Sequence, residues 1–162
     1  MSTALAAVLR PIPIPTSDVL RKDPAAQAFM LMRIAFTVAP ILFGVDKFAG
    51  VLTDDWTKYL AAEYNDLIPG SASDAMHIVG VVEIAAGLLV AVVPRFGGLL
   101  VAAWLAGIIV SLLLVGGYGD IALRDFGLLL GALSLSRLAS AYADGADSLP
   151  ARGKEQDLAV AR

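Results

Sequence analysis

The sequence contains no cysteine and only one histidine, His77. The lack of cysteine excludes disulfides, thiolate nucleophiles and iron–sulfur clusters held by the chain. A single histidine also excludes a histidine-rich metal site and a haem held between two histidines of one chain. We therefore predict no metal site and no covalently bound cofactor. A redox role would depend on a cofactor that is bound reversibly or supplied by a partner.

Charged residues are also scarce. They make up 17% of the 162 residues, whereas about 25% is usual in a soluble protein. Hydrophobic residues make up 58% and the mean hydropathy is +0.76, which is more apolar surface than a soluble core of this size could bury. The net charge of −3 and the absence of a basic stripe argue against a nucleic-acid partner. The excess apolar surface indicates that the chain lies in a lipid bilayer.

Four long apolar runs divide the chain. Each is close to the ~20 residues that a helix needs to cross the hydrocarbon core. Lipid cannot satisfy free backbone groups, so runs of this uniform hydrophobicity must be helical. The sequence therefore predicts an all-α membrane protein with a four-helix transmembrane domain over residues 26–142. Its four spans are residues 26–50, 76–93, 97–115 and 121–142.

The two ends of the chain differ from this domain. Residues 1–25 form an arm in which three prolines alternate with Ile12 and Ile14, a pattern typical of extended backbone. The arm is interpreted either as a solvated tail or as a segment that lies on a partner or on lipid headgroups. Residues 143–162 are predicted to be a disordered tail.

Basic residues set the predicted orientation. Nine of the twelve lysines and arginines fall on the side of the two termini, and three fall on the other side. Cytoplasmic segments carry the excess of Lys and Arg, so both termini are predicted to be cytoplasmic. Arg33, Arg95 and Arg137 are interpreted as side chains that extend toward cytoplasmic phosphates.

The loop at residues 51–75 is then outside the membrane. It carries five acidic residues against Lys58 alone. Trp56, Tyr59, Leu60 and Tyr64 recur at the spacing of one helical face, and such aromatic residues favour the membrane interface. We predict a short amphipathic helix in this outer loop, between the first and second spans.

Small and polar residues recur at helical spacing in every span. Stripes of this kind let membrane helices pack closely, and Gly127-x-x-x-Gly131 has the familiar spacing for such packing. The stripes consist of Arg33, Thr37, Pro40, Gly44 and Lys47 in the first span, Met76, Gly80, Glu83 and Gly87 in the second, Trp104, Gly107 and Ser111 in the third, and Arg124, Gly127, Gly131 and Ser134 in the fourth.

Glu83 needs a partner, because it lies roughly 10 Å inside the second span at ~1.5 Å per residue. A lone carboxylate at that depth costs at least ~2.5 kcal/mol. Lys47 and Arg124 lie at compatible depth on inward stripes. The predicted polar cluster is Asp46, Lys47, Glu83, Arg124 and Asp125, with His77, Trp56 and Tyr59 at its rim. It is either a structural network of ion pairs or a pocket for a small molecule or a quinone headgroup.

The order of short motifs resembles the DoxX and DoxX-like family of four-helix bacterial membrane proteins, over roughly residues 29–140. This resemblance implies a place in the bacterial plasma membrane and an association with membrane redox systems. The motifs are Arg33 in the first span, Gly44-Val45-Asp46-Lys47-Phe48 at its end, Trp56 and Tyr59-Leu60 in the loop, Met76, Gly80-Val81-Val82-Glu83-Ile84 and Ala86-Gly87 in the second span, and Ala122-Leu123-Arg124-Asp125-Phe126-Gly127-Leu128 in the fourth.

Three functions are compatible with these features. The first is an accessory subunit of a quinone-linked or other respiratory electron-transfer system, without catalytic activity of its own and with quinone as its reversible ligand. The second is a small transporter that uses the cluster as a substrate site, and the third is a structural scaffold subunit. No phosphate-binding loop, nucleophile elbow or zinc-protease motif is present, so no catalytic residue is predicted.

Overall fold

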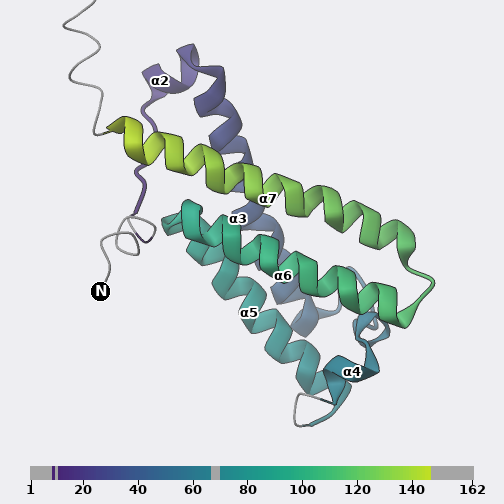
Figure 1. Cartoon of the computed structure of the whole chain (residues 1–162). Coiled ribbons are helices and arrows are strands. Elements are labelled where there is room, and N and C mark those ends of the chain that lie inside the picture. Colours follow the sequence, from purple (N-terminus) through teal and green to yellow (C-terminus); the bar gives the residue numbers. More distant parts are fainter. Residues whose placement is uncertain (1–8, 10, 67–69, 147–162) are drawn as a thin grey trace, which may run out of the picture.

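The computed structural model describes residue 9, residues 11–66 and residues 70–146, and these residues form helices and connecting loops with no strand among them. Four long helices make up the body: α3 (Pro24–Ala49), α5 (Ala72–Val92), α6 (Pro94–Val115) and α7 (Gly119–Ala146). Helix α3 packs along α5 and α6 packs along α7, while α5 and α6 join the two pairs (Figure 1). The all-α prediction is confirmed for the described residues. Most of the predicted C-terminal tail lies outside them.

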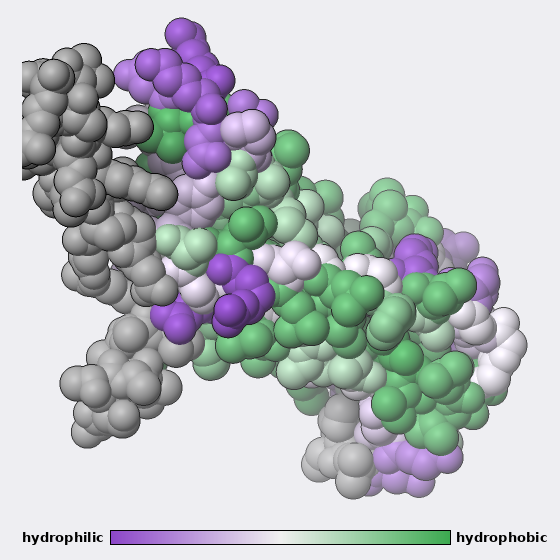
Figure 2. Space-filling view, turned by 45° about the horizontal axis from the view of Figure 1, so that its top comes forward, coloured by the Kyte–Doolittle hydropathy of each residue, from purple (hydrophilic) through white to green (hydrophobic). Residues whose placement is uncertain are grey.

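Three of these helices, α3, α5 and α6, are long and apolar enough to cross a membrane. Large hydrophobic side chains also cover the outside of the bundle; Leu31, Leu42 and Leu123, for example, are 69%, 58% and 72% exposed. Figure 2 shows this apolar surface across the middle of the molecule, with strongly hydrophilic residues gathered mainly toward its ends. A surface of this kind is stable in lipid and not in water. The chain is therefore a multi-pass membrane protein.

Local sequence signals set the helix ends. Asp23 caps α3 by accepting a hydrogen bond from the backbone N–H of Ala25, and Gly50 ends the helix in the left-handed conformation, with φ of 61°. Ser71 and Asp74 form a reciprocal capping box, so α5 begins at Ala72, four residues before the predicted start of that span. Apolar periodicity alone misses this first turn, because it contains Ser73 and Asp74 and no large apolar side chain.

The closest helix contact is the crossing of α3 and α5. A Cβ atom added to Gly44 would lie 2.5 Å from the carbonyl oxygen of Gly80, so the two backbones are in direct contact. Gly98 makes a similar approach to α7, where its added Cβ would lie 2.8 Å from the carbonyl oxygen of Ala132. The small-residue stripes are thus confirmed as packing surfaces at Gly44 and Gly80, whereas Gly98 belongs to no predicted stripe. The stripe positions Gly107 and Gly127 do not pack in this way, because a Cβ added at either meets no atom within 4 Å.

The proline-rich arm enters the bundle. Ile12 is only 7% exposed and belongs to the same core cluster as Phe29 and Val90. Arg33 is also buried, and its Nε donates a hydrogen bond of 3.2 Å to the carbonyl of Ala91 at the end of α5, while a second guanidinium nitrogen faces the carbonyl of Pro13. Ile12 therefore anchors the arm in the core, whereas most of the other described residues of the arm lie on the surface, and Ile14 is 68% exposed. The interpretation of Arg33 as an anchor for phosphates is wrong, because its donors serve backbone carbonyls.

Two further contacts fasten this end of the bundle, which we call the terminal end. The hydroxyl of Tyr142 on α7 donates a 2.8 Å hydrogen bond to Asp23, and its ring stacks on Phe29 with centroids 5.1 Å apart. A short helix, α2 (Ser17–Lys22), precedes Asp23. The opposite end, which holds the loop between α3 and α5 and the turn between α6 and α7, is called the loop end.

Candidate functional site

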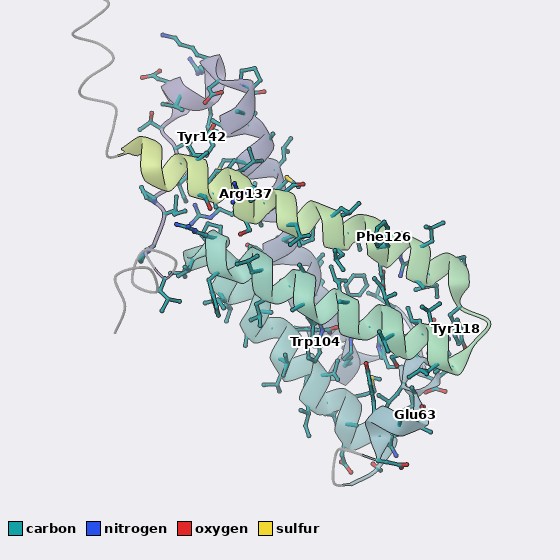
Figure 3. The ribbon with its side chains drawn as sticks, in the orientation of Figure 1. Glu63, Trp104, Tyr118, Phe126, Arg137 and Tyr142 are labelled. Atoms are coloured by element: carbon teal, nitrogen blue, oxygen red, sulfur yellow. The ribbon has the colours of Figure 1, made fainter. Side chains whose placement is uncertain are left out.

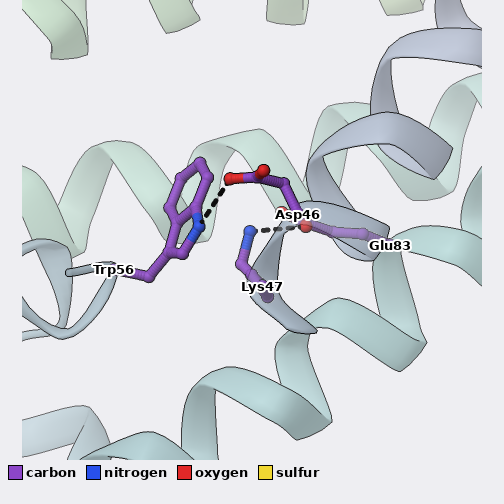
Figure 4. A network of polar contacts seen from close by, with 4 residues as sticks. All are labelled: Asp46, Lys47, Trp56 and Glu83. Atoms are coloured by element: carbon purple, nitrogen blue, oxygen red, sulfur yellow. Dashed lines mark hydrogen bonds and ion pairs between the residues drawn. The ribbon is translucent and has the colours of Figure 1, made fainter. Parts of the chain in front are cut away.

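An ion pair between Lys47 and Glu83 lies inside the loop end of the bundle. The Nζ of Lys47 is 2.6 Å from Oε2 of Glu83, and the two side chains are 4% and 10% exposed (Figure 4). Lys47 lies one turn after Gly44 on α3, and Glu83 lies one turn after Gly80 on α5. The glycine crossing therefore brings the two helices close enough for the charges to meet.

Trp56 covers this ion pair from the loop. Its ring centroid is 4.1 Å from the Nζ of Lys47, which is within the range of a cation–π interaction. Its Nε1 donates a 3.0 Å hydrogen bond to Asp46, whose other carboxylate oxygen accepts from the backbone N–H groups of Val51 and Leu52 (Figure 4). Asp46 thus turns the chain after α3 and holds the indole in place. Asp46 therefore positions Trp56 and is not itself a member of the Lys47–Glu83 ion pair.

The rest of the loop is seated on α6. The hydroxyl of Ser111 accepts a hydrogen bond from the backbone N–H of Ala61 and donates one to the carbonyl of Tyr59, both at 3.0 Å. The hydroxyl of Tyr64 donates to the carbonyl of Gly107 at 3.3 Å. The predicted α6 stripe of Trp104, Gly107 and Ser111 therefore includes the surface on which the loop rests.

The loop does not form the single amphipathic helix that its aromatic spacing predicted. It contains a 3₁₀ turn, Thr57–Tyr59, and a short helix, α4 (Ala62–Asn65), separated by extended backbone at Leu60. The extended backbone at Leu60 turns the N–H of Ala61 toward Ser111, to which it donates a hydrogen bond. Ser111 belongs to α6, which is distant from the loop in the sequence. Spacing within the loop carries no information about such a partner.

Trp104 contributes a buried donor beside the ion pair. Its indole nitrogen is buried and faces the Glu83 carboxylate, but it completes no hydrogen bond of standard geometry among the described residues. A buried N–H without a partner costs about 1–3 kcal/mol. Sequence reasoning placed Trp104 in a packing stripe and missed this role. The sequence did hold a signal for this role, because Trp104 and Glu83 lie at similar depth in the membrane on neighbouring spans.

Arg124 and Asp125 do not join Lys47 and Glu83. The Arg124 side chain is 65% exposed, and its Nε lies 3.4 Å from the carboxylate of Asp125, the next residue along α7. No ion pair in the described part of the chain connects either residue to Glu83. The predicted cluster is thus divided: Asp46, Lys47 and Glu83 come together, and Arg124 and Asp125 form a separate pair.

A pocket of about 380 Å³ opens beside the ion pair, between the end of α3, the loop and the first turns of α5. Lys47 and Trp56 line it, as do two stacked rings, Phe48 and His77, with centroids 4.9 Å apart and planes within 8°. Hydrogen bonds from the hydroxyl and N–H of Thr57 hold the pKa of Asp55, which also lines the pocket, below its ordinary value. The rest of the lining is Ala49, Gly50, Thr53, Asp54, Thr57, Ser73 and Met76.

Two of the three predicted rim residues, Trp56 and His77, therefore line this pocket. Tyr59 does not. It packs between the rings of Trp56 and Tyr118, at centroid distances of 6.0 Å and 5.2 Å, and so connects the loop to the turn before α7. Figure 3 shows Tyr118 at that turn, at the loop end of the bundle.

Comparison with known proteins returns no relative for this chain: no protein-family model, curated protein or solved structure matches it. A functional assignment therefore depends on the residues and on the geometry described above. That geometry comprises a buried Lys–Glu pair, an indole over its cation, a spare indole N–H beside its anion, and an adjoining pocket.

Proposed function

We propose that this chain is a DoxX-like accessory subunit of a bacterial plasma-membrane electron-transfer system, which binds a quinone headgroup in the pocket at its loop end. The observation that carries the proposal is that pocket, because it adjoins the buried ion pair and is lined by both Lys47 and Trp56. The chain has no cysteine, so it holds no thiolate-bound redox centre. A subunit of this kind would present the quinone to a redox partner.

The proposed membrane placement has four spans. Helix α7 is 28 residues long and follows α6 after a turn of three residues, so it runs back along α6 through the same layer. An even number of spans leaves both termini on one side, and the excess of Lys and Arg makes that side cytoplasmic. The loop end, with its pocket, then faces outward.

The chemistry of the pocket suits a quinone. Its volume of about 380 Å³ falls within the ~300–1,000 Å³ of pockets that hold small molecules. The flat rings of Phe48, Trp56 and His77 can stack on a flat headgroup. The ammonium of Lys47, which lines the pocket, is a donor, and a quinone carbonyl is an acceptor.

Tryptophan fluorescence tests this proposal, because the chain has only two tryptophans. In a Trp104→Phe variant the emission comes from Trp56 alone, and we expect a short-chain quinone to quench it with a saturable dependence on concentration. His77→Ala removes one stacking ring without touching the ion pair, and we expect severalfold weaker binding from the loss of about 1 kcal/mol. Lys58→Ala, in the same loop but outside the pocket lining, is the matched control.

Two outcomes would refute quinone binding here. One is quenching that rises linearly with quinone concentration, as for collisions in the micelle. The other is saturable quenching that His77→Ala leaves unchanged. The scaffold alternative is favoured by one specific observation, the nearly complete burial of the Lys47–Glu83 pair. A scaffold without a ligand would give only the linear response.

A further inference from the structure

A groove runs along the surface of α7 toward the terminal end of the bundle. It measures about 800 Å³ and is lined by Leu130, Leu133, Ser134, Arg137 and Leu138. Leu130 and Leu133 are 48% and 37% exposed, so the groove is a surface feature that no other described helix covers. Gly127, one turn before Leu130, is open as well, because a Cβ added there meets no atom within 4 Å.

Arg137 gives this apolar groove a charged end. It is exposed on α7 (Figure 3), and no carboxylate among the side chains that the structure describes, up to residue 142, forms an ion pair with it. Its neighbour Ser136 donates a 2.8 Å hydrogen bond to the carbonyl of Arg95, which brings the backbone of a second arginine to the same place. Arg124, at the other end of α7, differs because it has Asp125 as a partner.

The position of Arg137 along α7 makes an anionic partner favourable, because the side chain starts below the membrane surface. It lies five residues before residue 142, where the fourth span is predicted to end, which is about 7.5 Å along the helix axis at ~1.5 Å per residue. With α7 in the bilayer, as proposed above, this exposed guanidinium lies inside the headgroup boundary, where an unpaired charge is costly. Phosphate oxygens are its natural partners in a membrane.

We propose that this groove binds an anionic diacyl phospholipid, with an acyl chain along the three leucines and the headgroup phosphate on Arg137. The inference rests on the proposed membrane placement of α7 but not on quinone binding. Charge complementarity favours a lipid over a second copy of the chain, since two parallel copies facing each other across this groove would bring their Arg137 side chains together.

The test is thermal unfolding of the full chain in detergent, with phosphatidylglycerol or phosphatidylcholine of the same acyl chains added. We expect phosphatidylglycerol to raise the Tm more. Arg137→Gln should weaken its binding roughly fivefold, the effect of losing one basic contact, and Arg137→Lys should keep most of it. Arg124→Gln, on the same helix, is the matched control: the loss of its pair with Asp125 can lower the Tm itself, but the difference between the two lipids should stay as in the unmodified chain.

Three results would overturn the proposal: equal stabilisation by the two lipids, an unchanged lipid effect in Arg137→Gln, or full stabilisation by inorganic phosphate alone. A dimer that is lost in Leu133→Arg would assign the groove to a second copy and would also overturn it. The quinone titration separates this proposal from the proposed function, because Arg137 is remote from the loop end. Arg137→Gln should leave Trp56 quenching unchanged whether or not the lipid binds.

Discussion

Replacing Glu83 by glutamine is expected to destabilise the bundle by about 3–5 kcal/mol, the usual cost of removing one partner from a buried ion pair. The substitution keeps the shape of the side chain but leaves the ammonium of Lys47, whose side chain is 4% exposed, without its counter-charge. The cation–π contact with Trp56 compensates for only part of this loss. Reversible unfolding of the purified protein in mixed micelles measures the effect.

The double variant Lys47→Met with Glu83→Met provides the decisive comparison. It removes both charges and keeps apolar volume, so it should be milder than Glu83→Gln alone. Glu63→Gln, an exposed loop position, controls for the chemical change itself and should be close to neutral. If the free energy of unfolding lost in the double variant equals the sum of the losses in Lys47→Met and Glu83→Met, the two side chains do not depend on each other.

Replacing Gly44 by alanine is expected to cost about 1–3 kcal/mol from overpacking. The new Cβ would lie 2.5 Å from the carbonyl oxygen of Gly80 and 2.8 Å from Ile84, and the first of these is a backbone atom that cannot rotate away. Helices α3 and α5 would have to separate, which would also lengthen the contact between Lys47 and Glu83. Binding to the pocket should therefore weaken together with stability.

Gly107→Ala is the matched control for this prediction. Gly107 also lies in a long apolar helix, but an added Cβ there meets no atom within 4 Å. Alanine has the higher helix propensity, so this variant should be neutral or slightly more stable. Equal losses for Gly44→Ala and Gly107→Ala would show that α3 and α5 do not pack through Gly44.

The membrane character of the chain could be predicted from the sequence, because hydrophobicity over twenty residues is a local property. The small-residue stripes likewise predicted the contact surface of α3 and α5, and with it the positions of Lys47 and Glu83 on facing sides. In each case the relevant signal lies within one helix, at the spacing of its own turns.

The errors came from contacts between distant segments. Both faces of α7 carry small residues, so its stripe pattern did not show that Arg124 faces outward with Gly127. The proline pattern correctly indicated non-helical backbone over residues 11–16, but it could not show that residues 17–22 form α2 or that Ile12 enters the core next to Phe29. The α6 residue Ser111 likewise determines the form of the loop through a tertiary hydrogen bond.

The central claim is that the pocket beside Lys47 faces outward and holds a quinone. The absence of cysteine makes it testable at a single position, Thr53, which is half-buried in the pocket lining. We predict that a membrane-impermeant maleimide labels Thr53→Cys in intact cells, and that a short-chain quinone slows the labelling. Labelling that requires opened membranes, or whose rate is indifferent to quinone, would contradict this account.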